Sequence, residues 1–120
     1  MAILYEVLQG LPTVVAQAAA VEEVSFKEID DDVTLTTDDP RIGHIDPSDD
    51  PLTVTLPEFP YKGYTFTGQN VTANTNSITL DGNGKNINGN PDITFSGAYA
   101  GRTVQYDEVL DAYIVIRSVG

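Results

Sequence analysis

The chain has 120 residues, of which 18 are acidic and six are basic, so its formal net charge at pH 7 is −12. This charge repels the phosphates of nucleic acids and of anionic lipids, and we therefore expect neither a nucleic-acid partner nor a membrane partner. The absence of cysteine excludes disulfides, thiolate nucleophiles and zinc–thiolate sites, so the fold must be held by packing in one modest core.

The first twelve residues form a short apolar lead that ends at Gly10 and Pro12. It has no basic residues and is interrupted by Glu6, so we do not expect a secretory signal, and no apolar run in the chain has the length of a membrane span. The lead is too short to fold alone and must lie against another surface. Its large side chains are Ile3, Leu4, Tyr5, Val7 and Leu8.

Residues 13–23 predict one short helix. Alanines at positions 16 and 18–20 are good helix formers, and Thr13 can cap the first turn. The β-branched Val14 and Val15 argue against the helix, because their side chains lose rotamer freedom there.

From residue 24 onward the pattern changes to that of half-buried strands. Val24 and Phe26 alternate with polar residues, and so do Val33 and Leu35. Three consecutive aspartates at 30–32 predict a turn, and the Asp- and Pro-rich stretch 38–51 predicts a loop or linker. We place the domain boundary there, with an acidic attachment arm over residues 1–50 and a β-rich, trimerising domain over 51–120.

The second half predicts a series of short strands separated by Gly- and Asn-rich turns. Tight turns are expected at 81–84 and 88–91, where Asn and Gly tolerate a positive φ. The pattern is typical of an all-β fold, a small antiparallel β-sandwich or barrel-like domain behind an extended N-terminal arm. The predicted strands are 52–56, 63–67, 77–80, 86–87, 93–95, 103–106 and 113–116.

The sequence offers little that is typical of an enzyme. His44 is the only histidine and has no serine-centred motif to serve, so we interpret it as structural. The carboxylates cluster on turns, whereas a glycosidase needs two that oppose each other across a sugar. We therefore expect no catalytic residues.

No cofactor is expected either. The stretch that begins at Asp81 starts like a calcium loop, but Lys85 stands at a ligand position and no glutamate closes the loop. The acidic turns at 30–32 and 46–50 could still hold an adventitious calcium ion. The sequence Asn70-Val71-Thr72 matches a glycosylation acceptor, and we interpret it as a polar turn at a strand edge.

The strings 52–57, 63–67, 77–89, 101–107 and 112–116 together resemble the small β-modules of bacteriophage fibre and capsid-decoration proteins. In that group a strand ending in Leu-Pro precedes a Gly-aromatic strand, an Ile-x-Leu strand with a Gly/Asn-rich turn, and a closing strand pair. Where the group carries a tryptophan near the end, this chain has Tyr113. The likeness covers about residues 51–117 and implies a trimer without catalytic residues.

The resemblance implies a non-enzymatic virion protein on the exterior of the capsid, either a decoration (cement) protein or a short head fibre. Its partners would be two further copies and the major capsid protein or another virion protein. The apolar lead of residues 3–8 would make the attachment, ordered on docking. Association also suits the physics, because a domain this small is marginally stable alone.

The alternative is a receptor-binding module of a tail fibre or neck appendage that binds a host surface glycan. Exposed tyrosines supply rigid, amphipathic contact area for such a role, although tyrosines also serve as core residues in strands. The candidates for this surface contact are Tyr61, Tyr64 and Tyr99.

Overall fold

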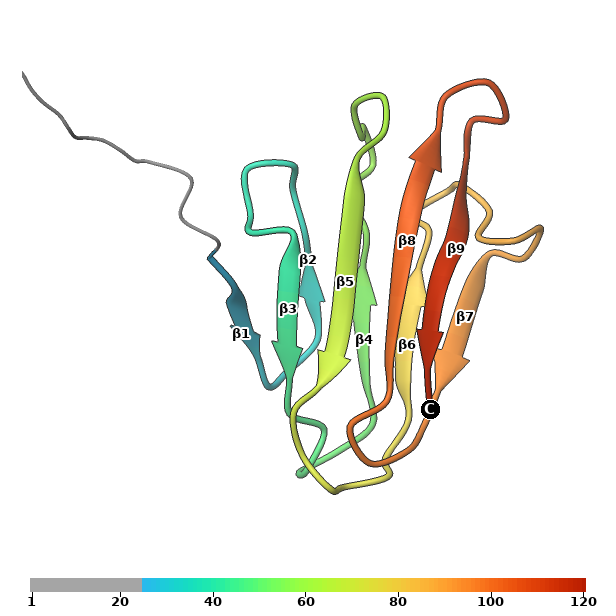
Figure 1. Cartoon of the computed structure of the whole chain (residues 1–120). Coiled ribbons are helices and arrows are strands. Elements are labelled where there is room, and N and C mark those ends of the chain that lie inside the picture. Colours follow the sequence, from blue (N-terminus) through green and yellow to red (C-terminus); the bar gives the residue numbers. More distant parts are fainter. Residues whose placement is uncertain (1–24) are drawn as a thin grey trace, which may run out of the picture.

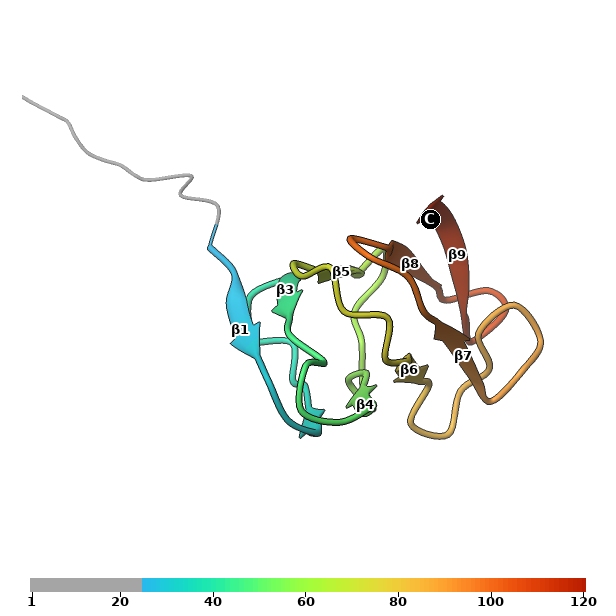
Figure 2. The same ribbon diagram turned by 90° about the horizontal axis from the view of Figure 1, so that it is seen from below.

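The computed structural model describes residues 25–120, which fold into two facing β-sheets (Figures 1 and 2). The described part of the chain contains strands and turns but no helix, and so no helix that could cross a membrane. The predicted helix at 13–23 and the predicted attachment residues Ile3, Leu4, Tyr5, Val7 and Leu8 lie outside the described residues.

The two sheets have five and four strands. The order in the five-stranded sheet is β1 (Lys27–Ile29), β3 (Ile42–Ile45), β5 (Thr65–Asn70), β8 (Gly101–Asp107) and β9 (Ala112–Val119). The order in the four-stranded sheet is β2 (Val33–Thr34), β4 (Leu52–Thr55), β6 (Ile78–Asp81) and β7 (Asp92–Phe95).

The first six strands form a stack of three coils. The chain passes from one sheet to the other after every strand, so each coil contributes one strand to each sheet, and neighbouring coils pair in parallel. Gly43 of β3 lies opposite Lys27 of β1 and Gly68 of β5. This arrangement is that of a short β-solenoid, in which each repeat contacts only its neighbours.

The last three strands pair antiparallel and follow the third coil. Strand β7 turns back on β6, β8 pairs with β5, and β9 pairs with β8. The all-β fold with two packed sheets is confirmed, but antiparallel pairing holds only in this part, because four of the seven strand pairs are parallel. The alternation of apolar residues predicts which face of a strand is buried, not the direction of its neighbour.

The core lies between the sheets and is built by the inward face of each strand. In β5 the burial alternates strictly, with Phe66 fully buried between outward-facing threonines. A Cβ atom on Gly43 would approach the Phe66 ring to 2.8 Å, so the glycine makes room for this ring in the neighbouring strand. The other buried apolar residues are Ile29, Leu35, Ile45, Leu52, Val54, Leu56, Tyr64, Ile78, Leu80, Ile87, Phe95, Ala100, Val104 and Tyr113.

The prediction of a linker over 38–51 was wrong for residues 42–45, which form strand β3. This strand lies between β1 and β5 in the five-stranded sheet, so residues 42–45 belong to the same sheet as β5, β8 and β9 from the second half of the chain. Aspartates and prolines on both sides mask its short pattern, in which Gly43 and Ile45 face the core.

Most predicted elements after residue 50 overlap with observed strands, and both predicted tight turns are present. Asn83 and Gly84 have φ values of 55° and 90°, and Asn88 and Gly89 have values of 50° and 85°. The predicted strand at 86–87 is not a strand. Ile87 forms only isolated bridges with Asn90 and Tyr113, and its side chain enters the core from the β6–β7 connection.

The glycosylation-like sequence is a polar turn, because the side chain of Asn70 is buried and fully bonded. Its Nδ2 donates to the carbonyl oxygens of Asn74 and Gly97, at 2.8 and 3.0 Å. Its Oδ1 accepts from the backbone N–H and the hydroxyl of Thr72, both at 2.8 Å. This amide therefore ties the β5–β6 connection to the β7–β8 connection.

Candidate binding groove

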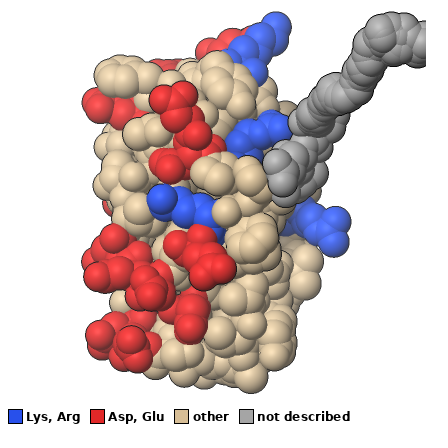
Figure 3. All heavy atoms as spheres, turned by 90° about the vertical axis from the view of Figure 1, so that its left-hand side faces the viewer, with Lys and Arg blue, Asp and Glu red and all other residues tan. Residues whose placement is uncertain are grey.

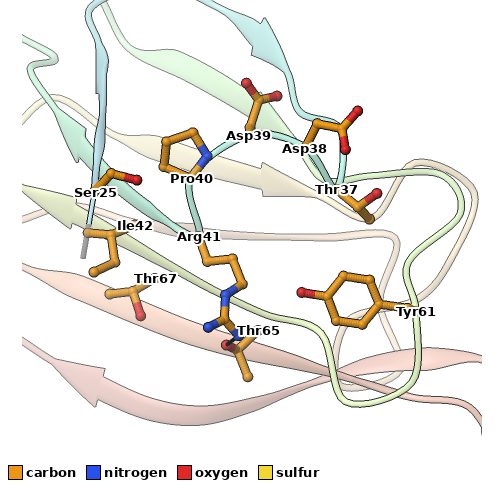
Figure 4. Close-up of a pocket in the computed structure, with 10 residues that line it drawn as sticks. All are labelled: Ser25, Thr37, Asp38, Asp39, Pro40, Arg41, Ile42, Tyr61, Thr65 and Thr67. Atoms are coloured by element: carbon orange, nitrogen blue, oxygen red, sulfur yellow. Dashed lines mark hydrogen bonds between the residues drawn. The ribbon is translucent and has the colours of Figure 1, made fainter. Parts of the chain in front are cut away.

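A groove with a volume of about 720 Å³ opens at one end of the strands, where the β2–β3 loop meets the outer face of β5. Ten residues line it (Figure 4). They come from the segment before β1, the β2–β3 loop, the start of β3, the β4–β5 loop and β5, and are Ser25, Thr37, Asp38, Asp39, Pro40, Arg41, Ile42, Tyr61, Thr65 and Thr67.

One wall of the groove is the β2–β3 loop, where residues 36–39 form a hydrogen-bonded turn. The backbone N–H of Thr36 donates to Oδ2 of Asp39 at 2.8 Å, and the N–H of Asp39 donates to the carbonyl of Thr36 at 3.1 Å. The other carboxylate oxygen of Asp39 lies 3.5 Å from Nζ of Lys27. The short polar side chains at 36–39 thus build the turn, as they do in Asx and ST turns generally.

Arg41 supplies the positive charge of the groove. Its backbone carbonyl accepts from the N–H of Thr67 at 2.9 Å, which fixes its Cα beside β5. Its guanidinium makes one long contact of 3.4 Å to the hydroxyl of Thr65 and forms no ion pair within residues 25–120. The side chains of Asp38 and Asp39 point away from it (Figure 4).

Tyr61 forms the other wall. Its side chain is half exposed and meets the ring of Tyr64 edge to face, with 5.4 Å between the ring centroids. Its hydroxyl is directed toward Arg41 and Thr65 (Figure 4). Because an aromatic ring that leans on a buried neighbour loses little freedom on binding, Tyr61 is a suitable contact residue.

The three tyrosines predicted to form one contact surface do not share one. Tyr64 is fully buried, and burial raises the pKa of its phenol to about 12, so its placement on a surface was wrong. Tyr99 is exposed, but it lies in the β7–β8 connection at the opposite end of the strands from Tyr61 (Figure 1). The sequence alone does not distinguish a tyrosine that faces the core from one that faces the solvent.

His44 lies on the outer face of β3, at a second and smaller hollow of about 330 Å³. Its ring stacks on that of Phe26 with 3.9 Å between the centroids, as expected of a structural histidine. The neighbouring carboxylate of Asp46 has a lowered pKa, because it accepts hydrogen bonds from Ser48.

The acidic turns are bonded to the backbone. Oδ1 of Asp32 accepts from the N–H of Thr53 at 2.8 Å, and Oδ1 of Asp46 accepts from the N–H of Ser48 at 3.0 Å. Within the described part of the chain, no three histidine or carboxylate side chains come together as a metal site. The acidic side chains gather instead along one side of the face that carries β1 (Figure 3).

Arg41, Thr65 and Thr67 were not predicted as site residues. The available signal was Arg41, the only basic residue between Lys27 and Lys62 in a strongly acidic stretch. Nothing in the sequence indicates that the β2–β3 loop lies beside β5, because that contact depends on the coiling of the chain.

No protein-family model matches this sequence, and comparison with curated proteins finds no significant similarity. The groove offers five hydroxyls, one guanidinium and the exposed carboxylate of Asp38. These groups are suited to hydrogen bonding with a polar ligand.

Proposed function

We propose that the protein is a non-enzymatic structural protein of a bacteriophage-type virion, a capsid-decoration protein or a short head fibre. Its N-terminal residues attach it to the exterior of the particle, by binding the major capsid protein or another virion protein. Its β-rich domain forms a trimer. The observation that carries the proposal is the difference between the two ends of the coil stack.

Later strands cover the C-terminal end of the stack, whereas residues 25–120 supply no strand beyond β1 and β2 at the N-terminal end. Beyond the third coil, β7 and the β8–β9 hairpin add further strands. At the first coil, β1 and β2 have three and two residues and one strand neighbour each among the described residues. A terminal repeat needs a polar cap or a partner, because an open strand edge invites pairing. The chain enters the body at this end, where an N-terminal attachment segment would be anchored.

The charge of this end supports docking on a basic surface. Residues 25–50 contain nine acidic and two basic side chains, and most of the acids are exposed. Phe26 in the same region is 47% exposed. A complementary basic patch on a shell protein would steer the encounter, and apolar residues would add to the affinity.

Deletion of residues 1–12 tests the attachment. We expect the truncated protein to keep the trimeric state and the β-type circular dichroism spectrum of the full chain but to lose binding to purified capsids. The control is the substitution Tyr99→Ala at a distant exposed position, which should leave capsid binding unchanged. Full binding by the truncated protein would contradict the proposal.

The groove favours a second candidate function, the binding of a host surface glycan by a tail-fibre or neck-appendage module. Saccharides are recognised by an aromatic face together with side-chain hydrogen bonds, and Tyr61, Arg41 and Thr65 provide both. We expect Tyr61→Ala to weaken glycan binding at least tenfold, which corresponds to about 1.4 kcal/mol. Tyr99→Ala is the matched control. Equal binding by the two variants, or no binding by the parent on a glycan array, would count against this function.

A further inference from the structure

Two loops at one end of the strands carry exposed apolar side chains, Phe59 on the β4–β5 loop and Val109 and Leu110 on the β8–β9 turn (Figure 1), and we call these three residues the apolar tip. These side chains are 81%, 86% and 61% exposed, the three highest values among the exposed large apolar residues of the described chain. We propose that this tip is the surface through which copies of the chain contact one another. The inference rests on the proposed trimer and identifies its interface.

The two loops that carry the tip lie at the same end of the strands (Figure 1). Phe59 belongs to the β4–β5 loop, and the other two residues form the turn between β8 and β9. The loops are tied together, because Nζ of Lys62 lies 3.5 Å from Oε2 of Glu108. Their bases are also bonded, since the N–H of Tyr106 donates to the carbonyl of Tyr64 at 2.8 Å.

The β8–β9 turn presents its apolar side chains in a fixed geometry. Oδ1 of Asp107 accepts from the N–H groups of Val109 and Leu110, at 2.9 and 3.2 Å. The hydroxyl of Tyr106 donates to Oδ1 of Asp111 at 2.7 Å on the other side of the turn. A side chain held in place by such bonds loses little entropy on association.

Valine and leucine are unusual residues at the tip of a hairpin. Gly, Asn, Asp and Ser are preferred there, because they tolerate the turn conformation and are well solvated. The turn at 83–84 follows this rule with Asn and Gly, whereas the β8–β9 turn does not. Grouped exposed apolar residues on a soluble protein mark an interaction surface.

Charge favours the tip over the first coil as the place where two identical copies meet. Residues 25–50 carry a net charge of −7, so two identical copies repel each other there. At the tip Glu108 is paired with Lys62 and Asp111 with Lys85, which leaves Glu58 and Asp107 as the acidic residues of the two loops outside the ion pairs of the described chain. Identical copies therefore repel each other less at the tip, which carries the three most exposed large apolar side chains of the described chain, than across residues 25–50.

The test is the solution mass of the full chain, measured by analytical ultracentrifugation, with and without the double substitution Val109→Ser and Leu110→Ser. We expect a trimer for the parent and about a threefold lower mass for the variant, with unchanged circular dichroism because serine suits the turn. Phe59→Ser should weaken the trimer independently. Val71→Ser, at an exposed position at the opposite end, is the matched control and should remain trimeric.

The possible results distinguish a failure of the tip as the interface from a failure of the proposed trimer. A trimer that persists in the double variant overturns the tip as the interface and leaves the proposed trimer standing. A monomeric parent chain overturns both. A monomeric parent whose capsid binding is lost in the double variant would assign the tip to a virion partner in place of a second copy.

Discussion

The coil region, β1 to β6, and the hairpin region, β7 to β9, use the same kind of strand in two different ways. In the coil region the chain crosses to the other sheet after every strand, and the pairs are parallel. In the hairpin region the chain turns back on itself, and the pairs are antiparallel. A parallel stack can continue indefinitely, so the antiparallel strands are what ends it at the C-terminal side.

The two regions are joined through one shared strand. Strand β5 pairs in parallel with β3 and antiparallel with β8, so it belongs to the coil region and supports the hairpin region. Side-chain bonds from Asn70 and Tyr113 add two further links between the regions. We therefore expect both regions to unfold in one cooperative event.

The largest effect is expected at Phe66, the fully buried residue of the shared strand. The substitution Phe66→Ala removes a ring that packs across β3 and β5, and we expect a loss of about 3–5 kcal/mol in the free energy of unfolding. Urea denaturation measures it. The control Gln105→Ala, on the exposed face of β8, should change the stability by less than about 0.5 kcal/mol. Separate transitions for the two regions in the parent protein would contradict a shared core.

The next effect is expected at Asn70. Asn70→Ala leaves the Thr72 N–H and the carbonyls of Asn74 and Gly97 without their partner, so we expect a loss of about 2–3 kcal/mol. Hydrogen exchange should report faster opening of the β7–β8 connection as well as of the β5–β6 connection. Thr75→Ala, an exposed change in the same loop, is the control. A loss confined to the β5–β6 connection would show that the amide does not couple the two regions.

Removal of the hydroxyl from Tyr113 or Tyr64 should change the free energy of unfolding by a smaller amount, and in different directions for the two residues. The hydroxyl of Tyr113 donates to the carbonyl of Pro57 at 2.9 Å in the core, so Tyr113→Phe should cost about 1–2 kcal/mol. The hydroxyl of Tyr64 is buried and has no hydrogen-bond partner among residues 25–120, so Tyr64→Phe should leave the stability unchanged or raise it. Thermal denaturation of both variants measures the contrast. An equal loss of stability in both variants would contradict the assignment of the loss to the Tyr113 hydrogen bond.

The smallest effect is expected at Asp111, whose bonds stay within the β6–β9 part of the molecule. The hydrogen bond from Tyr106 and the nearby ammonium of Lys85 lower the pKa of its carboxyl. A lowered folded-state pKa adds stability above the ordinary aspartate value of about 3.9, and this is lost as the pH falls. The difference in melting temperature between the parent and Asp111→Asn should therefore be small at pH 7 and disappear in acid.

The control for this acid effect is Asp92→Asn, which changes an exposed carboxylate of β7 outside the ion pairs of the described chain. Its melting temperature should follow that of the parent at every pH. A difference for Asp111→Asn that persists unchanged below pH 3 would mean that the effect comes from packing and not from the charge.

Of the candidate groove, the sequence indicated only Tyr61. The exposed aromatic could be proposed as a contact residue, but the same reasoning included Tyr64, which the core requires. Arg41 and Thr65 are 24 positions apart and come together because β3 and β5 are neighbours in one sheet. A contact between residues so far apart in the sequence depends on the order of the strands in the sheet. Local sequence patterns do not predict that order.

The sequence by itself determined that the protein is all-β, where most strands and turns lie, and that the charge concentrates in the first half. These properties depend on local chemistry, since period-two alternation marks a half-buried strand and Asn-Gly pairs mark tight turns. Only the tertiary structure decided that the first six strands coil in parallel, that residues 42–45 are a strand, and which tyrosine is buried. A strand's own residues specify its buried face, whereas its neighbour and their relative direction follow from the packing of the whole chain.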